Sequence, residues 1–155
     1  MRNPIRLVCL IGLAGLAAPS PARALDVTFT GIVLDTCTIA LATPGVMMLS
    51  SNGTILGTDQ TLGVPATVTV VSIGSNTISL DEPELLTHPG DYVPSNESIE
   101  MNYTGLADHP LFSSLGLNFN LGLVSLTNLF VNLRITDPDG FVQGTYTART
   151  VLTCS

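Results

Sequence analysis

Residue types that support catalysis or metal binding are sparse in this chain. The two histidines are His88 and His109. A metal site at His88 would take its other ligands from the surrounding acidic stretch, namely Asp81, Glu82, Glu84 and Asp91. This spacing matches no established metal-binding motif, and several prolines interrupt the stretch. We therefore expect residues 81–98 to form a long acidic surface loop, and we predict no metal site.

A second acidic motif, Asp137-Pro138-Asp139-Gly140, has the opening residues of a calcium loop. Such a loop requires a carboxylate at its last position, which by count from Asp137 is Ala148. Proline in second place and glycine in fourth place suit a type I turn. The motif therefore predicts a turn between two strands.

Nucleophilic catalysis has no support either. The chain contains no Gly-x-Ser-x-Gly motif of the kind that presents a catalytic serine. Its cysteines are better explained by a disulfide. We predict that the protein is not an enzyme and needs no cofactor.

The first residues of the chain have the pattern of an export signal, and the part that would carry any function follows them. Arg2 and Arg6 precede an apolar run at residues 7–18, and the triplet Ala22-Arg23-Ala24 comes after it. This order is typical of a cleavable secretory signal. The run is shorter than the roughly 20 apolar residues that cross a membrane. We expect residues 1–24 to be removed.

Residues 25–155 are then expected to form one exported domain, in the periplasm, at the cell surface or in the medium. This part keeps all twelve acidic residues but only Arg134 and Arg149, so its net charge is about −10. Nucleic-acid binding requires clustered cations, and we predict no nucleic-acid partner. No further apolar run of spanning length follows, so we expect no membrane span after signal cleavage.

Two cysteines remain after cleavage, Cys37 and Cys154. In an oxidising compartment an isolated pair is most simply a disulfide. Two free thiols or an intermolecular bridge are the alternatives. We predict the intramolecular bridge, which would close a loop that spans nearly the whole domain.

Alternation with a period of two dominates the rest of the chain and predicts strands. A long strand is expected over residues 25–40, with Cys37 and Ile39 on its apolar face. A β-branched run at residues 67–73 and the segment 77–80 are predicted to form a hairpin about Gly74-Ser75-Asn76. Further strands are expected at residues 46–50, 99–103, 115–123, 131–135 and 144–154. About seven short strands with frequent turns indicate an all-β sandwich or barrel.

Two passages resemble the exported subunits of bacterial chaperone–usher systems, including the spore coat protein U-like branch. Residues 27–39 (VTFTGIVLDTCTI) are similar to their first strand, and residues 144–154 (GTYTARTVLTC) to their final strand. The resemblance implies an immunoglobulin-like, pilin-like antiparallel β-sandwich that often lacks one strand. A neighbouring subunit donates that strand by β-augmentation. The partners implied are identical subunits or a periplasmic chaperone.

Residues 25–29 and 115–123 alternate and are uncharged apart from Asp26, so both segments are candidates for such pairing. An exposed edge of this kind invites pairing with another chain, and the alternative is that both segments lie inside a closed sandwich. The candidate pairing residues are Val27, Phe29, Leu117, Phe119 and Leu121.

Two functions follow as hypotheses. The first is an exported structural or interaction protein, a fimbrial or coat-like surface subunit that assembles by strand pairing. The alternative is a self-contained periplasmic or secreted binding domain that does not polymerise and uses residues 81–98 as its variable surface.

Overall fold

A computed structural model describes residues 35–105 and 108–155, which belong to one compact unit. The expected signal segment, Val27 and Phe29 lie outside the described residues. The regular elements of the described part are all strands, and no helix able to cross a membrane occurs in it. In chain order they are β1 (Thr36–Thr43), β2 (Met48–Leu49), β3 (Ile55–Gly57), β4 (Ala66–Ile73), β5 (Thr77–Leu80), β6 (Glu84–Thr87), β7 (Ser98–Thr104), β8 (His109–Ser113), β9 (Leu117–Asn120), β10 (Val124–Thr136), β11 (Thr147–Arg149) and β12 (Leu152–Cys154).

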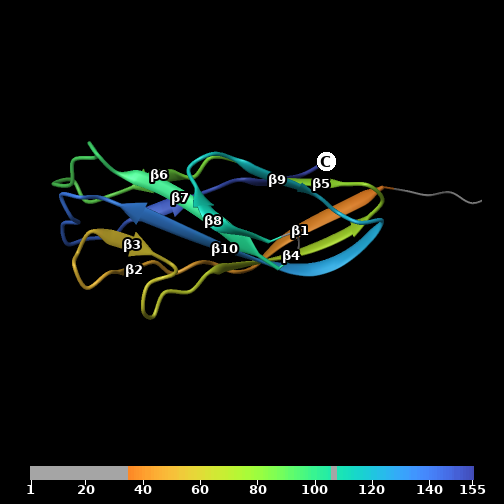
Figure 1. Cartoon of the computed structure of the whole chain (residues 1–155), viewed down its shortest axis with the longest axis horizontal. Coiled ribbons are helices and arrows are strands. Elements are labelled where there is room, and N and C mark those ends of the chain that lie inside the picture. The colour runs from red at the N-terminus through yellow and green to blue at the C-terminus, as the bar shows by residue number, and fades with distance from the viewer. Residues whose placement is uncertain (1–34, 106–107) are drawn as a thin grey trace, which may run out of the picture. The chain divides into compact units, whose positions relative to one another are not determined.

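These strands form two layers of antiparallel sheet, which confirms the all-β sandwich. The larger sheet has the order β1-β4-β10-β3-β2, with β7 along the second half of β10 and β8 beyond β7. The opposite layer holds a three-stranded sheet, β12-β5-β9, and a two-stranded sheet, β11-β6. Figure 1 shows β5 and β9 on one side and β1, β4 and β10 on the other.

The core fills the space between the layers. Along β4 and β10 every second residue points inward, so that Val70 and Leu129 are fully buried. Ile78 of β5 and Phe119 of β9 face them from the smaller sheet. The rest of the core comes from the same strands, from β7 and from the residue after β9, and comprises Val68, Leu80, Met101, Tyr103, Leu121 and Val131.

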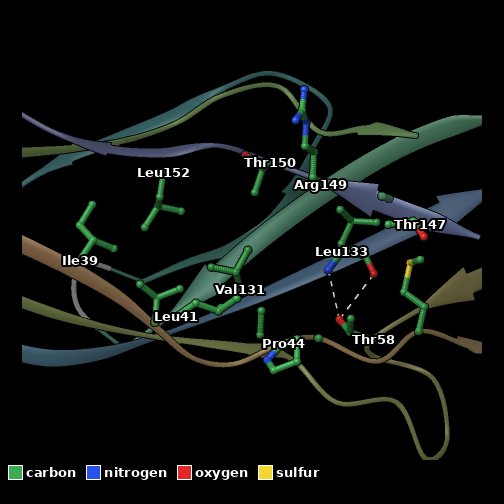
Figure 2. Close-up of a pocket in the computed structure, with 15 residues that line it drawn as sticks. Ile39, Leu41, Pro44, Thr58, Val131, Leu133, Thr147, Arg149, Thr150 and Leu152 are labelled. Carbon is green, nitrogen blue, oxygen red and sulfur yellow. Dashed lines mark hydrogen bonds between the residues drawn. The ribbon is translucent and has the colours of Figure 1, made fainter. Parts of the chain in front are cut away.

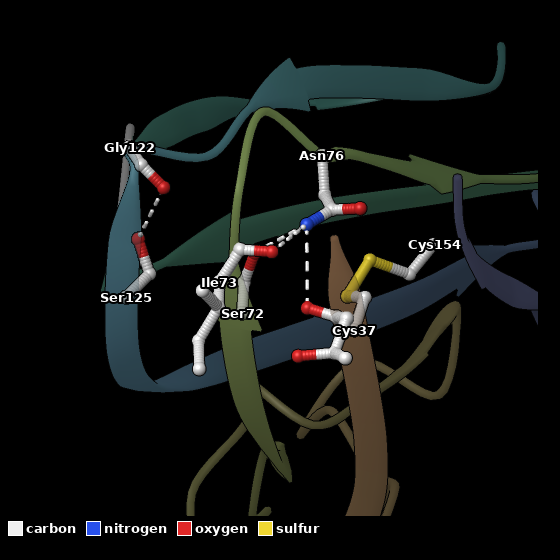
Figure 3. The surroundings of a disulfide bond; sticks show 8 residues. Cys37, Ser72, Ile73, Asn76, Gly122, Ser125 and Cys154 are labelled. Carbon is white, nitrogen blue, oxygen red and sulfur yellow. Dashed lines mark hydrogen bonds between the residues drawn. A yellow bond between two sulfur atoms is a disulfide. The ribbon is translucent and has the colours of Figure 1, made fainter. Parts of the chain in front are cut away.

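The predicted hairpin at residues 67–80 is wrong. β4 pairs with β1 and β10, whereas β5 pairs with β9 and β12 in the other layer. The intervening residues therefore carry the chain across the sandwich. The buried Asn76 amide stabilises this crossing by donating to Ser72 Oγ (2.8 Å), Ile73 O (3.1 Å) and Thr36 O (3.3 Å), as Figure 3 shows.

Gly74 makes the crossing sterically possible. Its φ is +98°, a conformation that favours glycine, and a Cβ there would collide with Asp35. The Gly74 N–H donates to the Leu123 carbonyl oxygen at 2.8 Å, which ties the crossing to the start of β10.

The long loop expected at residues 81–98 is also wrong in part. It contains β6, which pairs with β11, and a buried tyrosine, Tyr92. The tyrosine hydroxyl donates to Asp137 Oδ2 at 2.5 Å. The acidic residues and prolines of this segment are typical of a surface loop, so the sequence indicates neither β6 nor the burial of Tyr92. A short edge strand such as β6 has little apolar periodicity of its own.

The final predicted strand, residues 144–154, is divided. β11 pairs with β6 and β12 pairs with β5, so the two parts belong to different sheets. Between them the Thr150 hydroxyl donates to Asp81 O, and the Asp81 N–H donates to Val151 O. These contacts hold the chain where it changes partner.

Candidate strand-pairing groove

An open groove separates β1 from the β11–β12 segment. In the described residues β1 pairs only with β4, and β12 only with β5. Each strand therefore presents an unpaired edge to the other across the gap. The groove has a volume of about 450 Å³ (Figure 2).

The surface of the groove is largely apolar. Its floor is formed by Val131 and Leu133 of β10, with Val68 of β4 beside them. One wall consists of Ile39 and Leu41 of β1, and the other of Ala148, Thr150 and Leu152. Leu41 of the first wall is 64% exposed.

Polar groups in the groove already have partners. The Thr58 hydroxyl donates to Asn132 Oδ1 (3.0 Å) and accepts the Leu133 N–H (3.1 Å). Arg149 donates from Nε to Glu84 at 2.6 Å, outside the apolar floor. The groove therefore suits an uncharged, apolar occupant whose own backbone supplies the hydrogen bonds.

One end of the groove is covalently closed. Cys37 at the start of β1 and Cys154 at the end of β12 form a disulfide, with Cα atoms 6.2 Å apart (Figure 3). This confirms the intramolecular bridge predicted from the sequence. At the other end β1 runs on to Thr43 without a second partner strand.

The candidate pairing residues Leu117 and Phe119 lie on β9, which is at a sheet edge, and Leu121 directly follows this strand. β9 pairs only with β5 in the described part of the chain. However, Phe119 and Leu121 are buried in the core and Leu117 packs against it, so the alternation of residues 115–123 reflects an inward face. Only the β9 backbone is open to a partner, and pairing there stays a prediction.

The metal-ligating side chains of the described residues lie apart from one another. No group of three metal-ligating side chains gathers anywhere in residues 35–105 or 108–155. The Asp137 motif forms the expected turn, with the Gly140 N–H donating to Asp137 O at 3.1 Å. Asp137 Oδ1 accepts from the Asp139 N–H, so this carboxylate serves the turn.

The two arginines among the described residues, Arg134 and Arg149, are both in ion pairs. Arg149 pairs with Glu84, and Arg134 pairs with Asp59 while its guanidinium lies 4.1 Å from the centre of the Phe112 ring. Burial, the largest single effect, acts to raise the pKa of Asp59, but the hydrogen bonds from Arg134 and Gln60 and the positive charge of Arg134 outweigh it together, and the pKa is lowered. Among the described residues, most acidic side chains thus lack a cationic partner.

Comparison with known proteins supplies no family, because no protein-family model and no curated protein matches the chain. The groove itself was not predicted from the sequence. Its walls come from strands that are far apart in the chain, and only their relation in space creates it.

Proposed function

We propose that the protein is an exported structural subunit that assembles by strand pairing. In this proposal an extended segment of a second copy enters the groove and pairs with β1 on one side and with β11–β12 on the other. The observation that carries it is an apolar groove with two facing, unpaired strand edges. A strand placed there would complete the sandwich.

The segment before β1 has the pattern that the groove requires. Leu25, Val27 and Phe29 alternate with Asp26 and Thr28, so three apolar side chains would face one way in a strand. The wall from Ala148 to Leu152 has the matching length of about five residues, or roughly 17 Å at the rise of an extended chain. Backbone hydrogen bonds would supply affinity, and the alternate side chains would supply fit.

A complementation experiment tests the proposal. Phe29→Asp should disable the donated segment, and Leu41→Asp should disable the groove wall. The chain from Leu25 to Ser155 should form a ladder of oligomers in light scattering, whereas each variant alone should stay monomeric. A mixture of the two should give a one-to-one dimer and nothing larger, because it contains one intact segment and one intact groove.

Leu115→Asp is the matched control, since Leu115 is 65% exposed and lies outside the groove. It should assemble like the unmodified chain. A stable monomer of the unmodified chain would contradict the proposal. The self-contained binding domain would then take its place.

A further inference from the structure

We propose that one pair of opposite charges sets the register of the strand inserted in the groove. Asp26 of the guest copy, which donates the strand, lies directly opposite Arg149 of the host copy, which provides the groove. This inference rests on the function proposed above and names the contact that aligns the two copies. Apolar fit alone leaves the register open, because a slip of two residues along an alternating strand keeps the same side chains facing inward.

The disulfide determines the direction of the inserted strand. Cys37 at the start of β1 and Cys154 at the end of β12 close the same end of the groove. The guest chain continues from Phe29 into its own domain and must leave at the open end, so Leu25 points toward the disulfide. The guest therefore runs antiparallel to the wall formed by β11 and β12, and its residues can be matched one to one with those of the wall.

The wall formed by β11 and β12 alternates without interruption between exposed and half-buried residues. The half-buried residues line the groove and are Tyr146, Ala148, Thr150 and Leu152. The residues between them are exposed, and Figure 2 shows the Arg149 side chain pointing away from the floor of the groove. An inserted strand would continue this pattern, with its own exposed residues directly beside those of the wall.

The guest segment and the two walls of the groove each offer very little charge. Arg149 is the one charged residue in the wall segment 145–153, and β1 contains none. In residues 25–34 of the guest the one charged residue is Asp26. Opposite charges directly across a strand pair attract each other. A slip of two residues in either direction would instead place Asp26 beside Thr147 or Val151.

Arg149 is placed to bind two carboxylates at once. Its Nε donates to Glu84 of β6 at 2.6 Å, and the two side chains are about half exposed. The guanidinium carries four further N–H groups, and the guest would lie on the side of β11 opposite to β6. An exposed ion pair contributes little affinity. The pair of Asp26 with Arg149 would therefore select the register more than it strengthens the complex.

Side-chain size supports the same alignment. In this register Phe29 of the guest lies opposite Tyr146 of the host. There the groove continues into a second hollow of about 450 Å³, whose lining includes Tyr146, Met47 and Leu56. Phe29 is the largest apolar side chain of the guest segment, and this hollow offers space for it.

Trapping by an engineered disulfide tests the register. The guest carries Leu41→Asp, which disables its own groove, together with Thr28→Cys. The host carries Phe29→Asp, which disables its own segment, together with one cysteine on the wall. In the proposed register Thr28 lies opposite Thr147, so a host with Thr147→Cys should form a covalent dimer under mild oxidation. The dimer is measured on a non-reducing gel.

The matched controls are hosts with Thr145→Cys or Val151→Cys, whose side chains are exposed on the same face of the wall. They should react at least about tenfold more slowly, because positions two residues along a neighbouring strand already lie about 7–8 Å away, beyond the usual reach of a disulfide. Faster trapping at either control would overturn the register while the proposed function stands. Absence of any complex would overturn both.

Asp26→Asn in the guest tests the charge pair. It should raise the dissociation constant by roughly two- to fivefold with a host that retains Arg149, and it should not weaken binding to a host with Arg149→Gln. A host with Arg134→Gln is the control, since Arg134 pairs with Asp59 and does not line the groove, and it should show the full loss. Equal losses with all three hosts would overturn the pairing of Asp26 with Arg149.

Discussion

Tyr92 anchors residues 81–98, a segment that the sequence predicts to be a surface loop. The side chain is 4% exposed, and its ring packs against Phe141 and Tyr146 with centroid distances of 5.8 and 5.2 Å. Its hydroxyl donates to Asp137, which is itself 3% exposed. Burial, followed by the hydrogen bond to Asp137, raises the pKa of Tyr92 well above its usual value near 10.

The raised pKa predicts a loss of stability in alkali. Above about pH 10 the unfolded chain releases the Tyr92 proton while the folded chain retains it, so the free energy of unfolding should fall as pH rises. Below that pH the contribution should be fully present. Tyr92→Phe should remove up to about 1.4 kcal/mol per pH unit from this slope. Urea unfolding from pH 7 to 11.5 would measure it.

At pH 7 the same variant should lower the free energy of unfolding by about 1–3 kcal/mol, because a buried Asp137 oxygen loses its donor. Tyr146→Phe is the control, since its hydroxyl donates only to the Val142 carbonyl oxygen in an exposed contact. An alkaline slope that Tyr92→Phe leaves unchanged would show that Tyr92 ionises normally in the folded state.

The residues around Asn76 predict a turn, but they do not predict which sheet the next strand joins. The triplet Gly74-Ser75-Asn76 correctly predicts a change of chain direction. It does not indicate whether the next strand returns to the same sheet or crosses to the other layer. That choice depends on Ser72 and Thr36, which accept from the Asn76 amide, and Thr36 is distant in sequence.

At the scale of strands, the best predictions came from strict alternation. Cys37 and Ile39 face inward on β1, and Met101 and Tyr103 are buried on β7, as the pattern predicts. Partner strands were harder to predict, as the division of residues 144–154 between two sheets shows. Side-chain pattern reports which face of a strand is buried, whereas hydrogen-bond partners depend on the whole fold.

The disulfide is the strongest single tie between β1 and β12. It joins residues 117 positions apart, so its removal should enlarge the conformational freedom of the unfolded chain considerably. We expect Cys37→Ala combined with Cys154→Ala to lower the free energy of unfolding by about 3–5 kcal/mol. Urea unfolding of the oxidised protein and the double variant would test this.

The unmodified protein in a reductant should match the double variant, which separates loss of the bridge from loss of the sulfur atoms. A difference below about 1 kcal/mol would mean that the two strand ends remain close even in the unfolded chain.

At the scale of the whole molecule, acidity and exposed apolar surface act against each other. The chain has twelve acidic and five basic residues, which favours separate molecules, while the assembly that we propose at the apolar groove would favour association. Since salt screens repulsion between exposed charges over about 10 Å at 0.1 M, added salt should shift this balance toward association.

We therefore predict that the chain from Leu25 to Ser155 assembles more tightly through the groove as sodium chloride rises from about 50 to 500 mM, by a factor of several. Sedimentation at fixed protein concentration would measure the change. The same chain with Leu41→Asp should remain monomeric throughout. Dissociation by salt would indicate that attraction between charges holds the copies together, contrary to the apolar contact inferred above.

The Cys37–Cys154 disulfide at the end of the groove would also limit how far an inserted strand could extend along it. Neighbouring strands lie about 4.8 Å apart, so a strand held between two others needs roughly 9.6 Å between its hosts. At Cys37 and Cys154 the host backbones are only 6.2 Å apart. In the assembly that we propose, an entering strand would have to stop before this point, and the disulfide would fix how far it enters. Every copy would then come to rest at the same position, and a growing fibre would keep a constant spacing.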